Sequence, residues 1–344
     1  MRNKDAGFSL IEFAIASLAA LTMLAAAFTL MNTMFTANGD MGEVMATQQN
    51  VRVAMNTIAR DITTAGTGLP TSAVAVPNGT NAVPIIRPGM AAFADPDRNI
   101  EAPNNAIPIL SPGNSDGPMV SGVDTDALTI FSVDQTSPTW NIASIAVFSD
   151  RYEVTFTTDV SGGAMQLFAG DVLLFTNFNG SVLGCVTDVS TVTNTLAFFR
   201  ETDLMGLNQP LAQFGNIDSL KNPGTNPAVF PPTTATRVNI VNYFISVDNA
   251  EHPRLIRAVN AQAPQIIAED IENLQFSFDL FDFDTNAATS NQATTSLPNQ
   301  IRAVRVSING RSPERMKNGR YYHFPLASKI NVRNSTFRNR YTGS

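Results

Sequence analysis

The sequence predicts an α+β protein in which a long N-terminal helix packs on an antiparallel, β-rich head. Three observations support this prediction. The chain is predominantly apolar over residues 8–35, with Glu12 as the single charge. Apolar residues at helical spacing then continue as far as Ile62. From Ala127 onward, short alternating or apolar runs alternate with turn residues, which favours antiparallel strands over βαβ units.

The first element is a short basic leader, residues 1–7, followed by the apolar run 8–35. As a helix, that run would be roughly 42 Å long, which is more than enough to cross a bilayer. A secretory signal peptide would have a shorter apolar region and a small-residue cleavage site. An ordinary signal anchor fits the length, and Arg2 and Lys4 favour a cytoplasmic N-terminus. It gives no reason for Glu12 inside the run, where a carboxylate is expensive.

The pattern G-FSLIE, from Gly7 to Glu12, resembles the N-terminal signature of type IV prepilins and of the pseudopilins of type II secretion. The resemblance implies that a prepilin peptidase cleaves between Gly7 and Phe8 and that the new amine of Phe8 is methylated. It also implies that Glu12 is an assembly carboxylate. An isolated carboxylate is unfavourable among packed apolar helices, so the α-amino group of a neighbouring subunit would compensate it. That pairing would set the axial register between subunits.

The helix is predicted to extend over residues 8–65, with a membrane half at 8–35 and an amphipathic half beyond it. Asn38-Gly39 is a local weak point that favours a kink. The breakers Gly66, Gly68 and Pro70 end the helix. The apolar stripe that would pack on the head consists of Met41, Val44, Gln48, Val51, Met55, Ile58 and Ile62.

Residues 66–123 form an irregular segment rich in Pro, Gly and Asn, which is either a surface excursion over the sheet or a binding loop. Within it, Gly113 to Gly117 formally match a G-x-S-x-G nucleophile motif. The strand and helix that such a nucleophile elbow requires are missing from the pattern. We therefore predict no catalytic residues, no enzyme activity and no cofactor.

The head is predicted to occupy residues 124–344, with an exposed loop at 284–299 and a basic C-terminal tail. A Pro/Gly-rich stretch at 221–234 is predicted to separate two groups of strands. Cys185, the only cysteine, excludes an intramolecular disulfide and is interpreted as a buried strand residue. The predicted strands are ALTIFSV, YEVTFTT, GDVLLFTNF, SVLGCVTDVS, TVTNTLAFF, RVNIVNYFISV, PRLIRAVN, LQFSFDLF and IRAVRVSI.

The order of these elements resembles the PilW-type minor pilins over most of the chain. The likeness lies in QQNVRVAMNTIARDITTAG, DALTIFSV, AGDVLLFTN before VLGCVTDV, NYFISV, PRLIRAVN and IIAEDIENLQFSF. The related GspJ-type pseudopilins are the alternative. The resemblance implies a subunit that primes or caps pilus assembly. Its partners would be other minor and major pilins and the inner-membrane assembly platform. It would lie in the bacterial inner membrane, with the head outside the cytoplasm, and later in the pilus at the cell surface.

Two further patterns could bind ligands. Asp282, Asp284 and Asn286 open like a calcium loop, but Ala287 and Ala293 stand where that loop needs Gly and Glu. We therefore assign no metal site and keep these three residues as weak candidates.

The second pattern is the tail from Arg311 to Ser344, where basic residues alternate with aromatics. Such a pattern can bind nucleic acid. Docking against an acidic partner or the acidic remainder of the chain is the favoured interpretation. The formal charge of −7, or −8 after loss of Arg2, Lys4 and Asp5, argues against nonspecific nucleic-acid binding by the whole chain. A nucleic-acid-binding or adhesive tip subunit stays open as a third function.

Overall fold

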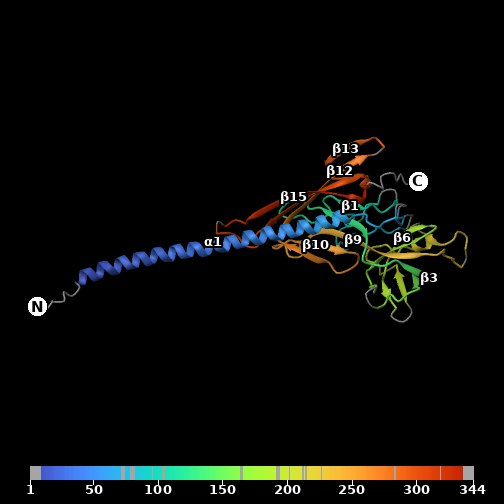
Figure 1. The fold of residues 1–344 in the computed structure, drawn as a ribbon, viewed down its shortest axis with the longest axis horizontal. Helices are drawn as coiled ribbons and strands as arrows, with labels where there is room; N and C mark the ends of the chain where they lie inside the picture. Colours follow the sequence, from blue (N-terminus) through green and yellow to red (C-terminus); the bar gives the residue numbers. More distant parts are fainter. Residues whose placement is uncertain are drawn as a thin grey trace.

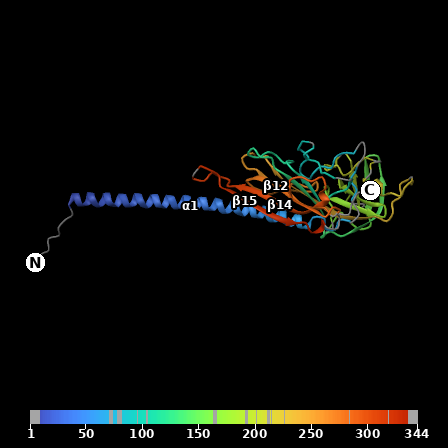
Figure 2. The ribbon, with the colours of Figure 1, turned by 90° about the horizontal axis from the view of Figure 1, so that it is seen from above.

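The chain folds as one long helix and a β-rich head. The computed structural model describes residues 9–335 apart from 71–73, 78–81, 95, 103–104, 163–165, 191–193, 201, 211–212, 214, 226, 283 and 318. Helix α1 (Leu10–Thr64) has 55 residues, and its N-terminal half projects far beyond the head (Figures 1 and 2). The helix continues without a break through Asn38-Gly39, because a single exposed glycine costs only about 1 kcal/mol relative to alanine.

The larger sheet is organised around β9 (Thr234–Ser246), the longest strand. Its C-terminal half pairs with β2 (Ala127–Val133) and β10 (Arg254–Val259), and its N-terminal half pairs with β3 (Trp140–Val147) and β5 (Val172–Asn177). The other strands of this sheet are β1 (Leu110–Gly113), β4 (Arg151–Phe156), β6 (Gly180–Cys185), β7 (Asp188–Val189), β8 (Thr195–Phe199) and β11 (Gln265–Glu269). Short 3₁₀ helices lie at Ile217–Leu220, Pro298–Gln300 and Arg333–Ser335.

The smaller sheet has the strand order β13-β12-β14-β15. Its strands are β13 (Ala287–Gln292), β12 (Ile271–Asp282), β14 (Ile301–Arg311) and β15 (His323–Asn331). Every pairing between these named strands, in both sheets, is antiparallel. The predicted α+β class is therefore confirmed.

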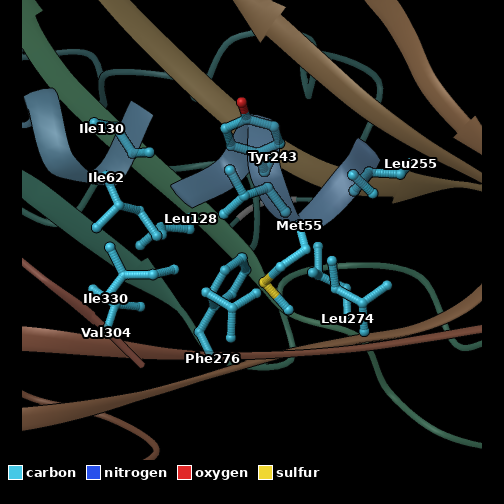
Figure 3. Packing of buried hydrophobic residues seen from close by; sticks show 14 of the residues in the cluster. Met55, Ile62, Leu128, Ile130, Tyr243, Leu255, Leu274, Phe276, Val304 and Ile330 are labelled. Carbon is cyan, nitrogen blue, oxygen red and sulfur yellow. The ribbon is translucent and has the colours of Figure 1, made fainter. Parts of the chain in front are cut away.

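The main core lies where the C-terminal half of α1 meets both sheets. Met55 and Ile62 of α1 contact this core from the helix (Figure 3). The larger sheet contributes residues such as Leu128 and Tyr243, and the smaller sheet contributes residues such as Phe276 and Val304. Burying one such side chain contributes about 1.5–3 kcal/mol relative to leaving it in water. The helix therefore joins the two sheets into one head.

The irregular segment 66–123 packs on the larger sheet and contains only one named strand, β1, among its described residues. Its buried side chains include Val74, Ile85 and Ile107, which join a cluster with strand residues of the sheet. This packing agrees with the interpretation of the segment as an excursion over the sheet.

A buried arginine anchors this segment. Arg87 is 1% exposed, and its guanidinium donates to the Ser111 carbonyl at 3.0 Å, to the Pro112 carbonyl at 2.6 Å and to Thr129 Oγ1 at 2.8 Å. It also forms an ion pair with Asp116 at 3.0 Å. Burial raises the pKa of the Asp116 carboxyl to about 6, although Arg87 opposes the shift. The carbonyl acceptors therefore hold Arg87 in place even where Asp116 is protonated.

Five strands, β1, β3, β11, β13 and β15, lie in segments where the sequence analysis predicts none. The last two lie in the smaller sheet. The prediction of a loop over residues 284–299 was wrong for β13, whose sequence AATSNQ is exposed along its whole length. Residues of the predicted basic tail form β15, which pairs with β14 over nine positions. Both are edge strands, held by backbone pairing with a partner that is itself in the core. Hydrophobic periodicity does not detect β13, because it requires a buried face. β15 does direct Phe324, Leu326 and Ile330 toward the core, and the sequence analysis missed this alternation.

A cluster of charges ties three strands of the smaller sheet together. Asp279 of β12 accepts from Arg305 of β14 at 3.1 Å and from Lys329 of β15 at 2.6 Å. Arg305 and Lys329 lie directly opposite each other across β14 and β15, so Asp279 separates two like charges. Burial favours the neutral acid, but these two cations and the Asn291 amide prevail and hold the pKa of Asp279 well below its ordinary range.

We expect Asp279→Asn to remove a stabilisation that depends on pH. Because the pKa of Asp279 is depressed in the folded state, its contribution is fully present above the unfolded pKa near 4 and is lost progressively as the pH falls from there through the lower folded-state pKa. At neutral pH the variant should lose about 1 kcal/mol of unfolding free energy, a figure discounted because Arg305 and Lys329 are partly exposed. Urea unfolding at pH 7 and at pH 3 checks this. A loss of equal size at both values would contradict it.

Candidate functional site

The N-terminal end of α1 is closed by a reciprocal pair of hydrogen bonds. Ser9 is the N-cap: the Glu12 amide donates to its Oγ at 3.2 Å, and the Ser9 amide donates to Glu12 Oε2 at 2.9 Å. This capping box places the carboxylate in the first turn, where the helix dipole favours negative charge. Gly7 and Phe8 lie outside the described residues. Glu12 is exposed, so its carboxylate is accessible to a cation from outside the chain.

The N-terminal half of α1 presents apolar side chains on every side. The exposed large side chains there are Leu10, Ile11, Phe13, Ile15, Leu18, Leu21, Met23, Leu24, Phe28, Leu30, Met31, Met34 and Phe35. The hydroxyls within this half are satisfied internally. Ser17, Thr22, Thr29 and Thr33 each donate to a carbonyl three or four residues earlier at 2.8–2.9 Å. This half is therefore long and apolar enough to span a membrane, and these four hydroxyls need no water as an acceptor.

The C-terminal half of α1 packs on the head over part of the predicted stripe. Val51, Met55, Ile58 and Ile62 are buried, with exposed fractions of 5% or less. Val44 and Gln48 are half-buried, whereas Met41 is 64% exposed. The extensive contact with the sheets thus begins near Thr47, later than the periodicity predicts, because the stripe runs past the edge of the sheets before the head covers it.

The helix ends where the sequence predicts. After Thr64, Gly66 adopts a left-handed φ of 76°, which a glycine tolerates without strain. Asn334, from the C-terminal end of the described chain, donates to the Ala65 carbonyl at 3.0 Å and to Thr67 Oγ1 at 2.8 Å. The first of these bonds satisfies the carbonyl of the C-cap residue Ala65, which the helix leaves without an internal partner.

The buried carboxylate of Asp61 connects α1 to the larger sheet through hydrogen bonds, and the sequence analysis did not identify it. Asp61 Oδ2 accepts from Tyr243 Oη of β9 at 2.7 Å and from Arg257 Nε of β10 at 2.7 Å. Burial, together with the charge of Asp61, raises the pKa of Tyr243, so the phenol stays protonated and donates. The available signal was an acid between Ile58 and Ile62 on an otherwise apolar face, where an isolated carboxylate needs a partner.

A glycine in β14 allows the helix to approach the smaller sheet closely. A Cβ atom at Gly310 would lie 2.5 Å from Val51 Cγ2 of α1, and Val51 is fully buried. We expect Gly310→Ala to destabilise the head by about 1–3 kcal/mol through overpacking. Thermal unfolding of the full chain measures this, with Gly42→Ala as the control, because it adds a methyl group at an open helical position and should not destabilise the chain. A Gly310 variant as stable as the natural chain would show that α1 and β14 do not meet here.

The other predicted residues take structural positions. Cys185 is buried at 2% exposure at the end of β6, and burial raises the pKa of its thiol well above the ordinary value. Asp282 accepts from the Asp284 amide and the Thr285 hydroxyl, and Asn286 has a left-handed φ of 53°, so these residues build a turn. Among the described residues, no group of three or more His, Cys, Asp or Glu side chains could hold a metal ion.

The G-x-S-x-G match begins at Gly113, the last residue of β1, so the prediction that no strand precedes it was wrong. The match continues as a turn in which the Ser115 amide donates to Asp126 Oδ1, and no helix follows it. Neither histidine pairs with Ser115 as a catalytic base would. His252 Nδ1 lies 2.7 Å from Asp270 Oδ1, and His323 Nδ1 lies 3.0 Å from Glu272 Oε2.

Part of the charge in the predicted basic tail contacts acids of the same head. Arg311 pairs with Glu272 at 3.1 Å, and Lys329 pairs with Asp279 at 2.6 Å. These pairs agree with docking of the tail on the acidic remainder of the chain.

Comparison of the chain with protein-family models, with curated proteins and with solved structures gave no match.

Proposed function

We propose that this chain is a minor pilin, a structural subunit that primes or caps a type IV pilus after its leader is removed. One observation carries the proposal. Glu12 lies in the first turn of a 55-residue helix whose N-terminal half is apolar and exposed and whose C-terminal half is fixed in a β-rich head. The carboxylate stands five residues after Gly7 and four after Phe8, in the register of the prepilin signature.

The shape of the molecule supports this role physically. An apolar helix that projects from a head can exchange lipid contacts for contacts with like helices, because neither environment requires it to bury polar groups. Glu12 is the exception, and we propose that it is neutralised by the N-terminal amine of a neighbouring subunit. The partners of the chain would be a prepilin peptidase, other minor and major pilins and the inner-membrane assembly platform.

We propose that the chain first lies in the bacterial inner membrane, with its N-terminus in the cytoplasm and its head outside. A GspJ-like pseudopilin of a type II secretion system would share Gly7, Phe8, Glu12 and the helix. The long packed segment 66–123 enlarges the head and favours the pilus subunit.

Fractionation in a host that makes both filament types tests the proposal. The tagged chain is expressed with and without the pilus assembly ATPase, and sheared surface filaments are separated from membranes. We expect the chain in the sheared pilus fraction, and its loss from that fraction when the ATPase is absent. Recovery in membranes alone, together with a secretion defect on deletion, would assign it to the secretion machine instead.

A further inference from the structure

The hairpin that joins β14 to β15 reaches along α1 to the end of the apolar run. Lys317 Nζ lies 3.4 Å from the hydroxyl of Thr36, the residue directly after Phe35. Further up the helix, Gln48 Nε2 donates to Tyr322 Oη at 3.2 Å. In Figure 2 this hairpin is the part of the head that extends farthest toward the N-terminal half of the helix. The hairpin tip is therefore placed at the point where α1 leaves the apolar span.

The hairpin holds its tip in a defined shape. The Met316 amide donates to the Arg320 carbonyl at 2.9 Å, and the Gly319 amide donates to the Met316 carbonyl at 2.8 Å. Gly319 has a left-handed φ of 76°, which closes the turn. At the base, the Ser312 amide donates to the Tyr322 carbonyl at 2.8 Å. The side chains at the tip thus start from a fixed backbone.

The tip presents exposed cations. Arg315, Lys317 and Arg320 are exposed, with Glu314 as the single acid between Arg311 and Tyr322. Among the residues that the structure describes, neither Arg315 nor Lys317 forms an ion pair.

Each of these two cations has only neutral contacts. Arg315 donates to the Gly319 carbonyl at 2.9 Å and stacks on the Tyr321 ring at 4.8 Å, and Lys317 contacts the Thr36 hydroxyl. Asp40 and Glu43, the acids of α1 that follow Thr36, form no ion pair with them among the described residues. Arg315 and Lys317 are thus exposed cations without an ion-pair partner in the described part of the chain.

The position of Arg315 and Lys317 along α1 indicates what they bind. A helix over residues 8–35 is roughly 42 Å long, close to the about 40–45 Å of a bilayer including its headgroups. Lys317 therefore lies at the level of the headgroups when α1 spans the membrane.

We propose that the β14–β15 hairpin docks on the headgroups of anionic phospholipids and holds the head against the membrane surface before the subunit is extracted. The inference rests on the membrane-spanning role of α1 in the proposed function. Each basic residue near an anionic surface contributes about 1 kcal/mol, so Arg315 and Lys317 together would shift the docking equilibrium by about thirtyfold. The alternative binding partner is the acidic N-terminal helix of another pilin subunit. The test below distinguishes lipid binding from binding to that helix.

The test uses the full chain reconstituted in vesicles, with a fluorophore on Met316→Cys. Cys185 is 2% exposed and should not react. Lipids that carry a quencher on the headgroup report how close the tip lies to the surface. We expect several times more quenching in vesicles with phosphatidylglycerol than in phosphatidylcholine alone, and less at high salt. Arg315→Gln/Lys317→Gln should remove the difference between the two lipids.

The matched control is Arg52→Gln/Arg60→Gln, which removes two exposed cations of α1 about 24 Å and 36 Å beyond Thr36. This control should behave like the natural chain. Equal quenching in both lipids, or an unchanged response of the hairpin variant, would overturn the proposal. A hairpin variant that ignores lipid charge but no longer enters filaments would assign the cations to the N-terminal helix of another pilin subunit and would also overturn it. Failure of the natural chain to float with the vesicles would contradict the membrane role of α1 itself.

Discussion

Glu12→Ala is expected to leave the chain inserted in the membrane and to lower its incorporation into filaments by about a hundredfold. Removal of the carboxylate makes the helix more apolar, so insertion does not suffer. In the filament, the N-terminal amine of the neighbouring subunit would be left without its counter-charge among apolar helices. Loss of one partner of a buried ion pair costs about 3–5 kcal/mol. Immunoblots of membrane and sheared-filament fractions measure the ratio.

Ser9→Ala is the matched control for this experiment. It removes the hydroxyl that accepts from the Glu12 amide and weakens the helix start by about 1 kcal/mol, but it keeps the carboxylate. We therefore expect the Ser9 variant to enter filaments nearly as well as the natural chain. If both variants are equally defective, Glu12 acts as a cap. If the Glu12 variant assembles normally, the carboxylate has no part in assembly.

Asp61→Ala is expected to have the largest effect on the stability of the head. The variant leaves the Arg257 guanidinium and the Tyr243 hydroxyl without their shared acceptor between α1 and the sheet. The expected loss is about 3–5 kcal/mol of unfolding free energy, a large fraction of the stability of a typical domain. Chemical unfolding of the detergent-solubilised chain, followed by tryptophan fluorescence of Trp140, measures it.

A double-mutant cycle with Tyr243→Phe tests whether the network acts as a unit. If it does, the losses from Asp61→Ala and Tyr243→Phe should not add, and the coupling should be about 0.5–3 kcal/mol. The neighbouring Arg60, whose side chain is 75% exposed, supplies the control, since Arg60→Ala should change stability by less than about 0.5 kcal/mol. Additive losses, or an Asp61 variant as stable as the control, would contradict the role assigned to the network.

Most elements with a buried face could be predicted from the sequence, although β1, β3 and β11 were not. The apolar run, the stripe through Val51, Met55, Ile58 and Ile62, and nine strand-containing segments all follow from periodicity, because each has side chains that water excludes. The antiparallel α+β class follows from them. The capping box formed by Ser9 and Glu12 has the sequence form S-x-x-E, so it could also have been predicted from the sequence.

The remaining features depend on the tertiary structure. β13 is held by backbone pairing at the edge of the smaller sheet, so its exposed side chains give no periodic signal. β15, at the other edge, packs only Phe324, Leu326 and Ile330 on the core, which is a weaker signal than that of the central strands. The partners of Asp61 lie about 180 and 200 residues away along the chain, a separation that no local pattern encodes. The hairpin contact between Lys317 and Thr36 is similarly remote.

Mass spectrometry of the N-terminus tests the central claim most directly, on protein isolated separately from membranes and from sheared filaments. The account predicts a chain that begins at Phe8 and carries one methyl group, and it predicts this species in the filament fraction. A chain that still begins at Met1 in cells with an active prepilin peptidase would contradict the account. The protein would then be a plain membrane-anchored head, and the proposal of a pilin function would fall.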